Sequence, residues 1–173
     1  MKKTKLLMSI IVCILLAVTL FSVGAAAEDE QQKVYSKAAF GNIFEYTVEN
    51  GEATIVDVTI ENNSVVVPAE LGGYPVKKIG REAFALQDTI TSLIFQNGIE
   101  EIDDYGFSYC DVDDFYFDGK PEMQLKELSL PSSLKKIGNN AFCDVLLYCD
   151  LELPENLEYI GDRAFQPQKC IMM

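Results

Sequence analysis

The residues that could do chemistry in this 173-residue chain are carboxylates and thiols, because the sequence contains no histidine. Without histidine, neither a Ser-His nor a Cys-His nucleophile pair can form. The densest group of carboxylates is Asp111, Asp113, Asp114 and Asp118, and carboxylate oxygens are calcium ligands. This group lacks the spacing, the glycine and the closing glutamate of an EF-hand loop. A solvated acidic edge is therefore the alternative to a calcium site.

Other catalytic and metal-binding patterns are absent from the sequence. Nothing places two carboxylates across a cleft, as a glycosidase needs, and no Gly-rich phosphate loop occurs. The thiols of Cys143 and Cys149 lie six residues apart, so a disulfide between them is open to a secreted chain, with free thiols as the alternative. A zinc site is not expected, because there is no histidine and no Cys-x-x-Cys. We expect no enzyme activity, no metal and no cofactor.

The elements that must position any site are set by a repeated motif, Ile-Gly-x-x-Ala-Phe. It starts at Ile79, Ile137 and Ile160, and a degenerate copy starts at Ile102, so the steps are 23, 35 and 23 residues. A period of 23 lies in the range of leucine-rich repeats. Each unit is too small to bury its own apolar face and must stack on its neighbours, which predicts a solenoid.

Upstream of the copies at Ile102, Ile137 and Ile160 stands an apolar-x-x-apolar-x-apolar hexad, in residues 90–95, 125–130 and 148–153. Alternation within a hexad points Leu128 and Leu130 inward and Ser129 outward, as on a β-strand. Proline at 131 and 154 marks the strand ends, because proline has no N–H for a ladder. The fold class predicted is a β-rich leucine-rich-repeat solenoid with a parallel sheet ladder and short turns.

The 35-residue step contains one more hexad, residues 112–117. We interpret it as another strand of the same ladder, followed by a shortened coil. A surface insertion that bulges from one coil is the alternative.

These patterns resemble the bacterial BspA-type leucine-rich repeat, also called the Treponema pallidum type. Its unit reads L-x-x-L-x-L-P-x-x-L-x-x-I-G-x-x-A-F-x-x-C, which residues 125–142 and 148–165 match closely, and the likeness covers about residues 65–166. The leading coil of that family is similar to Gly73-Tyr74-Pro75-Val76 here. The resemblance implies a buried, inert Cys110, since the repeat itself has cysteine there. It also implies a surface protein, since known members include adhesins.

The first 27 residues are typical of a signal peptide. Lysines at 2, 3 and 5 precede an apolar run at 6–23, and small residues Ala25 and Ala27 fit a cleavage site before Glu28. An uncleaved transmembrane span is the alternative. We expect a secreted or extracellular cell-surface protein, with residues 28–33 as a polar leader.

The charge of the chain limits its partners. The net charge is −13, and it becomes −16 once residues 1–27 are removed with their three lysines. Such a surface repels nucleic acid and anionic membranes, and it favours cationic patches on proteins or divalent cations. We expect no nucleic acid, and no membrane contact after cleavage.

Residues 34–62 predict a β cap on the solenoid. Phe44, Tyr46 and Val48 alternate with polar residues, Asn50-Gly51 is a hairpin turn signal, and residues 53–60 form the return strand. The repeats then occupy residues 63–166, followed by a tail at 167–173. No hexad follows the last coil, so self-association through the C-terminal end is a second hypothesis.

The two residues before each repeat isoleucine alternate in sign along the stack. They are Lys77-Lys78, Glu100-Glu101, Lys135-Lys136 and Glu158-Tyr159. Opposite charges in neighbouring coils would lie about one strand spacing apart, near 4.8 Å. This pattern predicts salt bridges that select the register, with a docking stripe as the alternative.

The function that we predict is recognition of a protein ligand on host or neighbouring cells through the strand face. A structural envelope module and a glycan-binding protein are the alternatives, although the absence of tryptophan counts against glycans. Ile94 and Tyr116 are the proposed apolar anchors. The full set of outward residues on this face is Val66, Ile94, Asp114, Tyr116, Glu127, Ser129, Asp150 and Glu152.

Overall fold

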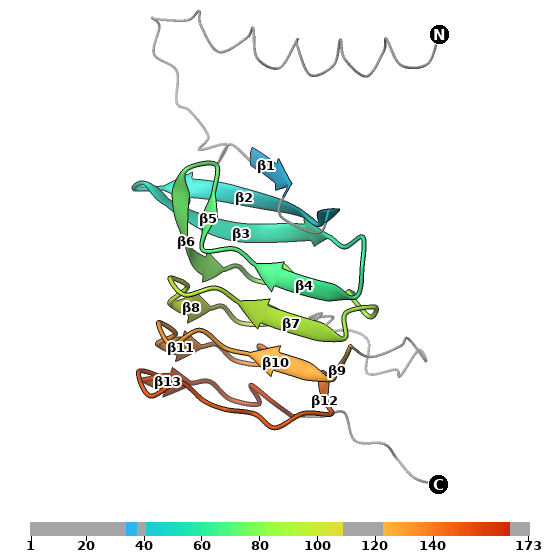
Figure 1. Ribbon diagram of the computed structural model, residues 1–173. Helices are drawn as coiled ribbons and strands as arrows, with labels where there is room; N and C mark the ends of the chain where they lie inside the picture. The colour runs from blue at the N-terminus through green and yellow to red at the C-terminus, as the bar shows by residue number, and fades with distance from the viewer. Residues whose placement is uncertain (1–33, 38–40, 109–122, 167–173) are drawn as a thin grey trace, which may run out of the picture. The chain divides into compact units, whose positions relative to one another are not determined.

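The computed structural model describes residues 34–37, 41–108 and 123–166. These residues form a stack of β coils headed by an antiparallel hairpin (Figure 1). The predicted fold class is therefore confirmed. The signal peptide, the polar leader and the tail at 167–173 lie outside the described residues and stay predictions.

The largest sheet joins the cap to the coils. Its strand order is β1-β2-β3-β6-β8-β11-β13, with β5 paired to β6. From β3 to β13 the pairing is parallel, and β1-β2-β3 is antiparallel. The strands are β1 Val34–Lys37, β2 Ile43–Glu49, β3 Glu52–Thr59, β5 Glu70–Leu71, β6 Tyr74–Ile79, β8 Glu101–Ile102, β11 Lys136–Ile137 and β13 Tyr159–Ile160.

Two smaller parallel sheets complete the coils. One has the order β10-β7-β4, and the other pairs β12 with β9. Their bounds are β4 Ser64–Val67, β7 Ser92–Phe95, β10 Glu127–Ser129, β9 Gln124–Leu125 and β12 Leu146–Leu147. Side chains alternate as on any strand, so Leu93 and Phe95 point into the core while Ile94 faces outward.

The core consists of the repeat residues stacked in columns. Ile79, Ile102 and Ile137 pair in register and are fully buried, and Ile160 continues their column at the end coil. Burial of each such side chain stabilises the fold by about 1.5–3 kcal/mol.

The phenylalanines form a second column. The ring centroids of Phe84 and Phe107 lie 4.6 Å apart, those of Phe107 and Phe142 also 4.6 Å, and those of Phe142 and Phe165 5.2 Å. Phe44 of the cap meets Phe84 edge to face at 6.4 Å. The hairpin therefore covers the apolar end of the first coil, as the sequence predicts.

The corner of each coil depends on the repeat glycine for a reason other than its dihedral angle. A Cβ on Gly138 would lie 2.5 Å from the backbone nitrogen of Asp104, and one on Gly161 would lie 2.5 Å from that of Asn139. The left-handed residue comes two positions later, where Asn140 has φ 53° and Arg163 has φ 56°. Close approach of neighbouring coils therefore requires the glycine.

The interpretation of residues 112–117 as a strand inside the ladder is wrong. Strand β7 pairs directly with β10, with Leu93 opposite Leu128 and Ile94 opposite Ser129. Strand β8 likewise pairs directly with β11. No position for another strand is left between these neighbours. Residues 109–122 themselves lie outside the described part of the chain.

The third hexad also differs from its prediction. Residues 148–153 form no strand, and Tyr148 is 65% exposed, whereas Leu125 at the equivalent position is fully buried. The amide of Tyr148 still donates to the carbonyl of Leu125 at 2.7 Å, so the coil keeps its register. Within the described residues this coil has a neighbouring coil on one side alone, so its hexad makes fewer contacts there than β7, which has a neighbour on each side.

Candidate functional site

The candidate site is the outer face of the sheet β4-β7-β10, which we call the strand face. Val66, Ile94 and Ser129 stand opposite one another in adjacent strands and form one row. Val66 and Ile94 are half-buried and Ser129 is exposed. The sequence prediction that these three residues align is therefore confirmed, although nothing tests their role in binding.

A second row runs parallel to the first on the same face and is polar. Ser64, Ser92 and Glu127 stand opposite one another. The hydroxyl of Ser92 donates to Oε2 of Glu127 at 2.7 Å, and the Oγ atoms of Ser64 and Ser92 lie 3.4 Å apart. This bond holds the Glu127 carboxylate over the middle of the sheet, where it presents a fixed negative charge.

The remaining predicted site residues fall into two groups. Asp150 and Glu152 are exposed on the end coil, but they lie on no strand, so the sheet itself does not position them. Asp114 and Tyr116 lie outside the described residues, as does the acidic group from Asp111 to Asp118 with its proposed calcium site. The strand face therefore unites four predicted residues, which are Val66, Ile94, Glu127 and Ser129.

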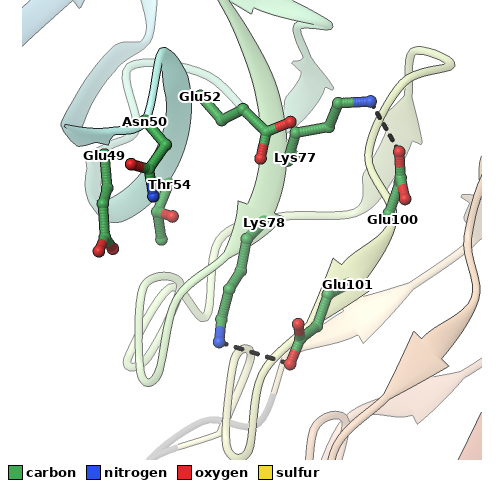
Figure 2. Close-up of a pocket in the computed structure, with 8 residues that line it drawn as sticks. All are labelled: Glu49, Asn50, Glu52, Thr54, Lys77, Lys78, Glu100 and Glu101. Atoms are coloured by element: carbon green, nitrogen blue, oxygen red, sulfur yellow. Dashed lines mark hydrogen bonds and ion pairs between the residues drawn. The ribbon is translucent and has the colours of Figure 1, made fainter.

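Beside the ladder lies a polar groove that the sequence analysis did not predict. It has a volume of about 280 Å³ between the tip of the β2–β3 hairpin and the charged residues of β6 and β8. Figure 2 shows Lys77 and Lys78 reaching across to Glu100 and Glu101. The lining residues are Glu49, Asn50, Glu52, Thr54, Lys77, Lys78, Glu100 and Glu101.

Both lysines that line this groove are neutralised by pairing. Lys77 Nζ lies 2.7 Å from Glu100, whose other oxygen accepts a hydrogen bond from Lys135. The bonds from Lys135 and Lys77 lower the pKa of Glu100 to about 2. The predicted alternation of sign thus produces direct ion pairs, and the groove holds no cation free for chemistry among its described lining.

The second line of pairs runs beside the first. Lys136 Nζ lies 2.7 Å from Glu101, and Lys78 Nζ lies 3.4 Å from Glu101 and 2.8 Å from Asp103. Burial alone would raise the pKa of Asp103, but the hydrogen bond from Lys78 lowers it below its usual range. The pairs join three coils across the 35-residue step.

A further set of residues links the corners of the coils. Oδ1 of Asp104 accepts the amide of Asn139 at 2.6 Å, and Oδ1 of Asn139 accepts the amide of Asp162 at 2.8 Å. We call this the Asx ladder. Its signal in the sequence is an Asp or Asn two residues after the repeat isoleucine in three of the four copies.

The thiols offer no reactive site among the described residues. Cys143 and Cys149 are both free, so the disulfide between them does not form in this structure. Burial raises the pKa of the Cys143 thiol to about 11, which keeps it protonated. Cys149 packs against the core rather than pointing outward.

Comparison with protein families matches residues 59–122 and 112–172 to the BspA type leucine rich repeat region. The chain belongs to the BspA-type leucine-rich repeat family. No curated protein matches the sequence. Within the described ranges of this BspA-type chain, no helix is long and apolar enough to cross a membrane, and no three Cys, Asp or Glu side chains group to hold a metal ion.

Three solved structures are similar to this BspA-type chain. The leucine rich repeat protein of T. pallidum has 19% identity and a TM-score of 0.46, with 71% of this chain and 64% of that chain covered. A leucine rich cell surface protein of Faecalibacterium prausnitzii has 19% identity and a TM-score of 0.46, with 75% and 39% covered. A leucine-rich repeat protein of Bacteroides ovatus has 23% identity and a TM-score of 0.37, with 77% and 37% covered. The chain spans less than two thirds of each of them.

Proposed function

We propose that this protein is a secreted or cell-surface binding module that recognises a protein ligand through the strand face and catalyses no reaction. One observation carries the proposal. The row Val66, Ile94 and Ser129 is aligned across β4, β7 and β10 and lies directly beside the hydrogen-bonded row that ends at Glu127. Two neighbouring apolar side chains, Val66 and Ile94, beside the hydrogen-bonded carboxylate of Glu127 form a surface that a protein partner can match.

The outer side of this sheet is unusual for parallel strands. Parallel sheets normally have both faces covered, because helices pack on them. Here one side of β4, β7 and β10 packs on the core, and no described element covers the other. A partner that covers Ile94 and Val66 would bury their remaining exposed apolar surface, and this burial would stabilise the complex.

The charge of the exposed residues favours a partner with a basic patch. Glu127 lies on the sheet, and Asp150 and Glu152 are exposed on the coil beyond it. Carboxylates around an apolar row steer a cationic surface towards it and disfavour acidic competitors. Asp114 and Tyr116 take no part in this proposal, because the direct pairing of β7 with β10 leaves no place for them in the row between Ile94 and Ser129.

The experiment compares two exposed apolar residues. Ile94→Ser alters the centre of the strand face, and Leu86→Ser alters a residue that is 61% exposed outside that sheet. Pull-down from extracellular matrix proteins and from surface proteins of neighbouring cells supplies the ligand, and its affinity is then measured for both variants. We expect Ile94→Ser to weaken binding by roughly tenfold or more, as for an interface anchor, and Leu86→Ser to leave it unchanged.

Charge reversal provides a second readout. Glu127→Lys should slow association and reduce the salt dependence of the rate, because a steering charge acts on the encounter. Normal binding by both Ile94→Ser and Glu127→Lys, in protein that remains folded, would exclude the strand face as the site.

A further inference from the structure

Each coil holds the next one through the same backbone acceptors. The carbonyl of Lys135 accepts the amides of Glu158 and Tyr159 at 2.8 and 3.1 Å, and the carbonyl of Ile137 accepts the amide of Gly161 at 2.8 Å. In the next coil, 23 residues later, the carbonyl equivalent to that of Lys135 belongs to Glu158, and the one equivalent to that of Ile137 belongs to Ile160. Among the described residues, neither of these two carbonyls accepts a hydrogen bond from another coil.

The corners supply matching donors. The amide of Asn140 donates to the carbonyl of Asp162 at 2.9 Å, and that of Phe142 donates to Ala164 at 2.7 Å. In the end coil the equivalent amides belong to Arg163 and Phe165, and no described carbonyl accepts them. Within the described residues β13 is therefore a sheet edge, with acceptors beside the strand and donors in the corner that follows it.

Side chains of the end coil continue the same template. Ile137 is fully buried, whereas Ile160 is 44% exposed and Tyr159 is 49% exposed. The carboxylate of Asp162 stands where Asn139 accepts an amide from the following coil. The edge thus presents an apolar column and a side-chain acceptor, both in register with the backbone groups.

Charge decides what kind of segment fits this edge. Along the ladder Lys77 contacts Glu100, Glu100 contacts Lys135, and Lys135 interacts with Glu158. The next position in this alternation is a cation. The other charged residues exposed on the end coil are Asp150, Glu152, Glu155, Asp162 and Arg163, so their balance is acidic.

We propose that the β13 edge binds an extended, cationic segment of another protein as an additional parallel strand. Its pattern is basic-x-aliphatic-Gly, in which the basic residue meets Glu158, the aliphatic residue covers Ile160, and the glycine allows close approach at Asp162. Main-chain hydrogen bonds supply the affinity and the side-chain columns supply the specificity. This site goes beyond the strand face, because it lies on a different sheet.

A second copy of this chain fits the edge less well. Two end coils facing each other would bring Glu158 and Asp162 of one molecule towards the same acidic surface of the other, and like charges are repelled at short range. Two runs within the described residues match the basic-x-aliphatic-Gly pattern, Lys77 to Gly80 and Lys135 to Gly138. Both are already paired on both sides, the first by β3 and β8 and the second by β8 and β13.

The experiment uses the full chain and a synthetic peptide with the sequence of residues 132–142, Ser-Ser-Leu-Lys-Lys-Ile-Gly-Asn-Asn-Ala-Phe. The control peptide has glutamate in place of both lysines. Fluorescence anisotropy should show that the lysine peptide binds and that the control peptide binds roughly tenfold or more weakly. Hydrogen exchange should show that the bound peptide slows exchange at the amides of Arg163 and Phe165.

Two protein variants with the same change in net charge sharpen the test. Glu158→Lys should reverse the preference between the two peptides, and Glu52→Lys, on the exposed hairpin tip at the other end of the sheet, should leave it as in the native protein. Glu158→Gln keeps the side-chain shape and should reduce the preference for the lysine peptide over the control peptide. This variant replaces Glu158→Lys in the test if the lysine variant is poorly folded.

The proposal would be overturned by any of four results. The first two are failure of the lysine peptide to bind, and binding without slower hydrogen exchange at the amides of Arg163 and Phe165. The third is exchange at these amides that slows as the protein concentration rises, and the fourth is exchange that is already slow in the monomer before peptide is added. The third result would mean self-association, and the fourth would mean that the chain covers its own edge. Because the readout is on the end coil and not on the sheet β4-β7-β10, each of them leaves the strand-face proposal standing.

Discussion

Asn139 joins two coils, because its side-chain Oδ1 accepts the backbone amide of Asp162 at 2.8 Å while its own backbone amide donates to Oδ1 of Asp104 at 2.6 Å. Asn139→Ala removes the bond to Asp162 and the two 3.3 Å bonds from Nδ2 to the Asp104 carboxylate, and it leaves the amide of Asp162 with water alone. We expect a loss of about 0.5–1.5 kcal/mol in the free energy of unfolding, measured with urea. Glu155→Ala, which changes an exposed side chain with no described hydrogen bond, is the control and should lose less than about 0.5 kcal/mol.

The phenylalanine column predicts a gradient of stability along the stack. Phe142 is fully buried between Phe107 and Phe165, so Phe142→Ala should cost about 3–5 kcal/mol. Phe165 stacks on Phe142 alone and is half-buried, so Phe165→Ala should cost clearly less. Chemical denaturation checks both values, and equal losses at the two positions would contradict a column that is open at one end.

Two substitutions at corner residues with left-handed φ should change the free energy of unfolding in opposite directions. Glu82 and Asn140 occupy equivalent positions with φ 58° and 53°, and asparagine tolerates this conformation better than glutamate does. Glu82→Asn should therefore stabilise the protein by about 0.5–1 kcal/mol, and Asn140→Ala should destabilise it by a similar amount. Thermal unfolding of both variants provides the measurement. A loss of stability in Glu82→Asn would show that its contacts matter more than its dihedral angle.

Acid should weaken the ion-pair ladder at Glu100. Hydrogen bonds from Lys135 and Lys77 lower its pKa in the folded protein to about 2. Since the folded pKa lies below the unfolded one, the contribution of Glu100 is fully present above about pH 4.3 and is lost as the pH falls towards 2. The difference in unfolding midpoint between the native protein and Glu100→Gln should therefore shrink over this range. A difference that stays constant from pH 6 to pH 2 would argue against the pairing.

Much of the fold could be predicted because the repeat residues are the core. Ile102 and Phe107 belong to a degenerate copy of the motif, yet both stack in their columns and are almost fully buried. The hairpin turn at Asn50-Gly51 was equally readable, because both residues need positive φ and both have it. Burial and turn geometry depend on the residue type at single positions, so both can be predicted from the sequence.

Pairing between coils was less predictable, because it depends on neighbours that a hexad does not specify. Residues 148–153 alternate as β7 does, but in the described part of the chain they have a coil on one side alone and they form no strand. The hexad at 112–117 has a complete pattern, but β7 and β10 leave it no place between them. On the strand face, Ser92 could be placed opposite Glu127 only once that direct pairing was known.

The direct pairing of β7 with β10 shows that the stack keeps its register across a step of 35 residues as well as across steps of 23. Twelve additional residues between coils thus leave the hydrogen bonds, the isoleucine column and the ion pairs in place. The entropy of closing a loop grows slowly with its length, so such a step is tolerant of further lengthening. The connection between the second and third coils is accordingly a natural acceptor for foreign sequence, and this protein could serve as a display scaffold whose inserted peptide varies while its solenoid does not.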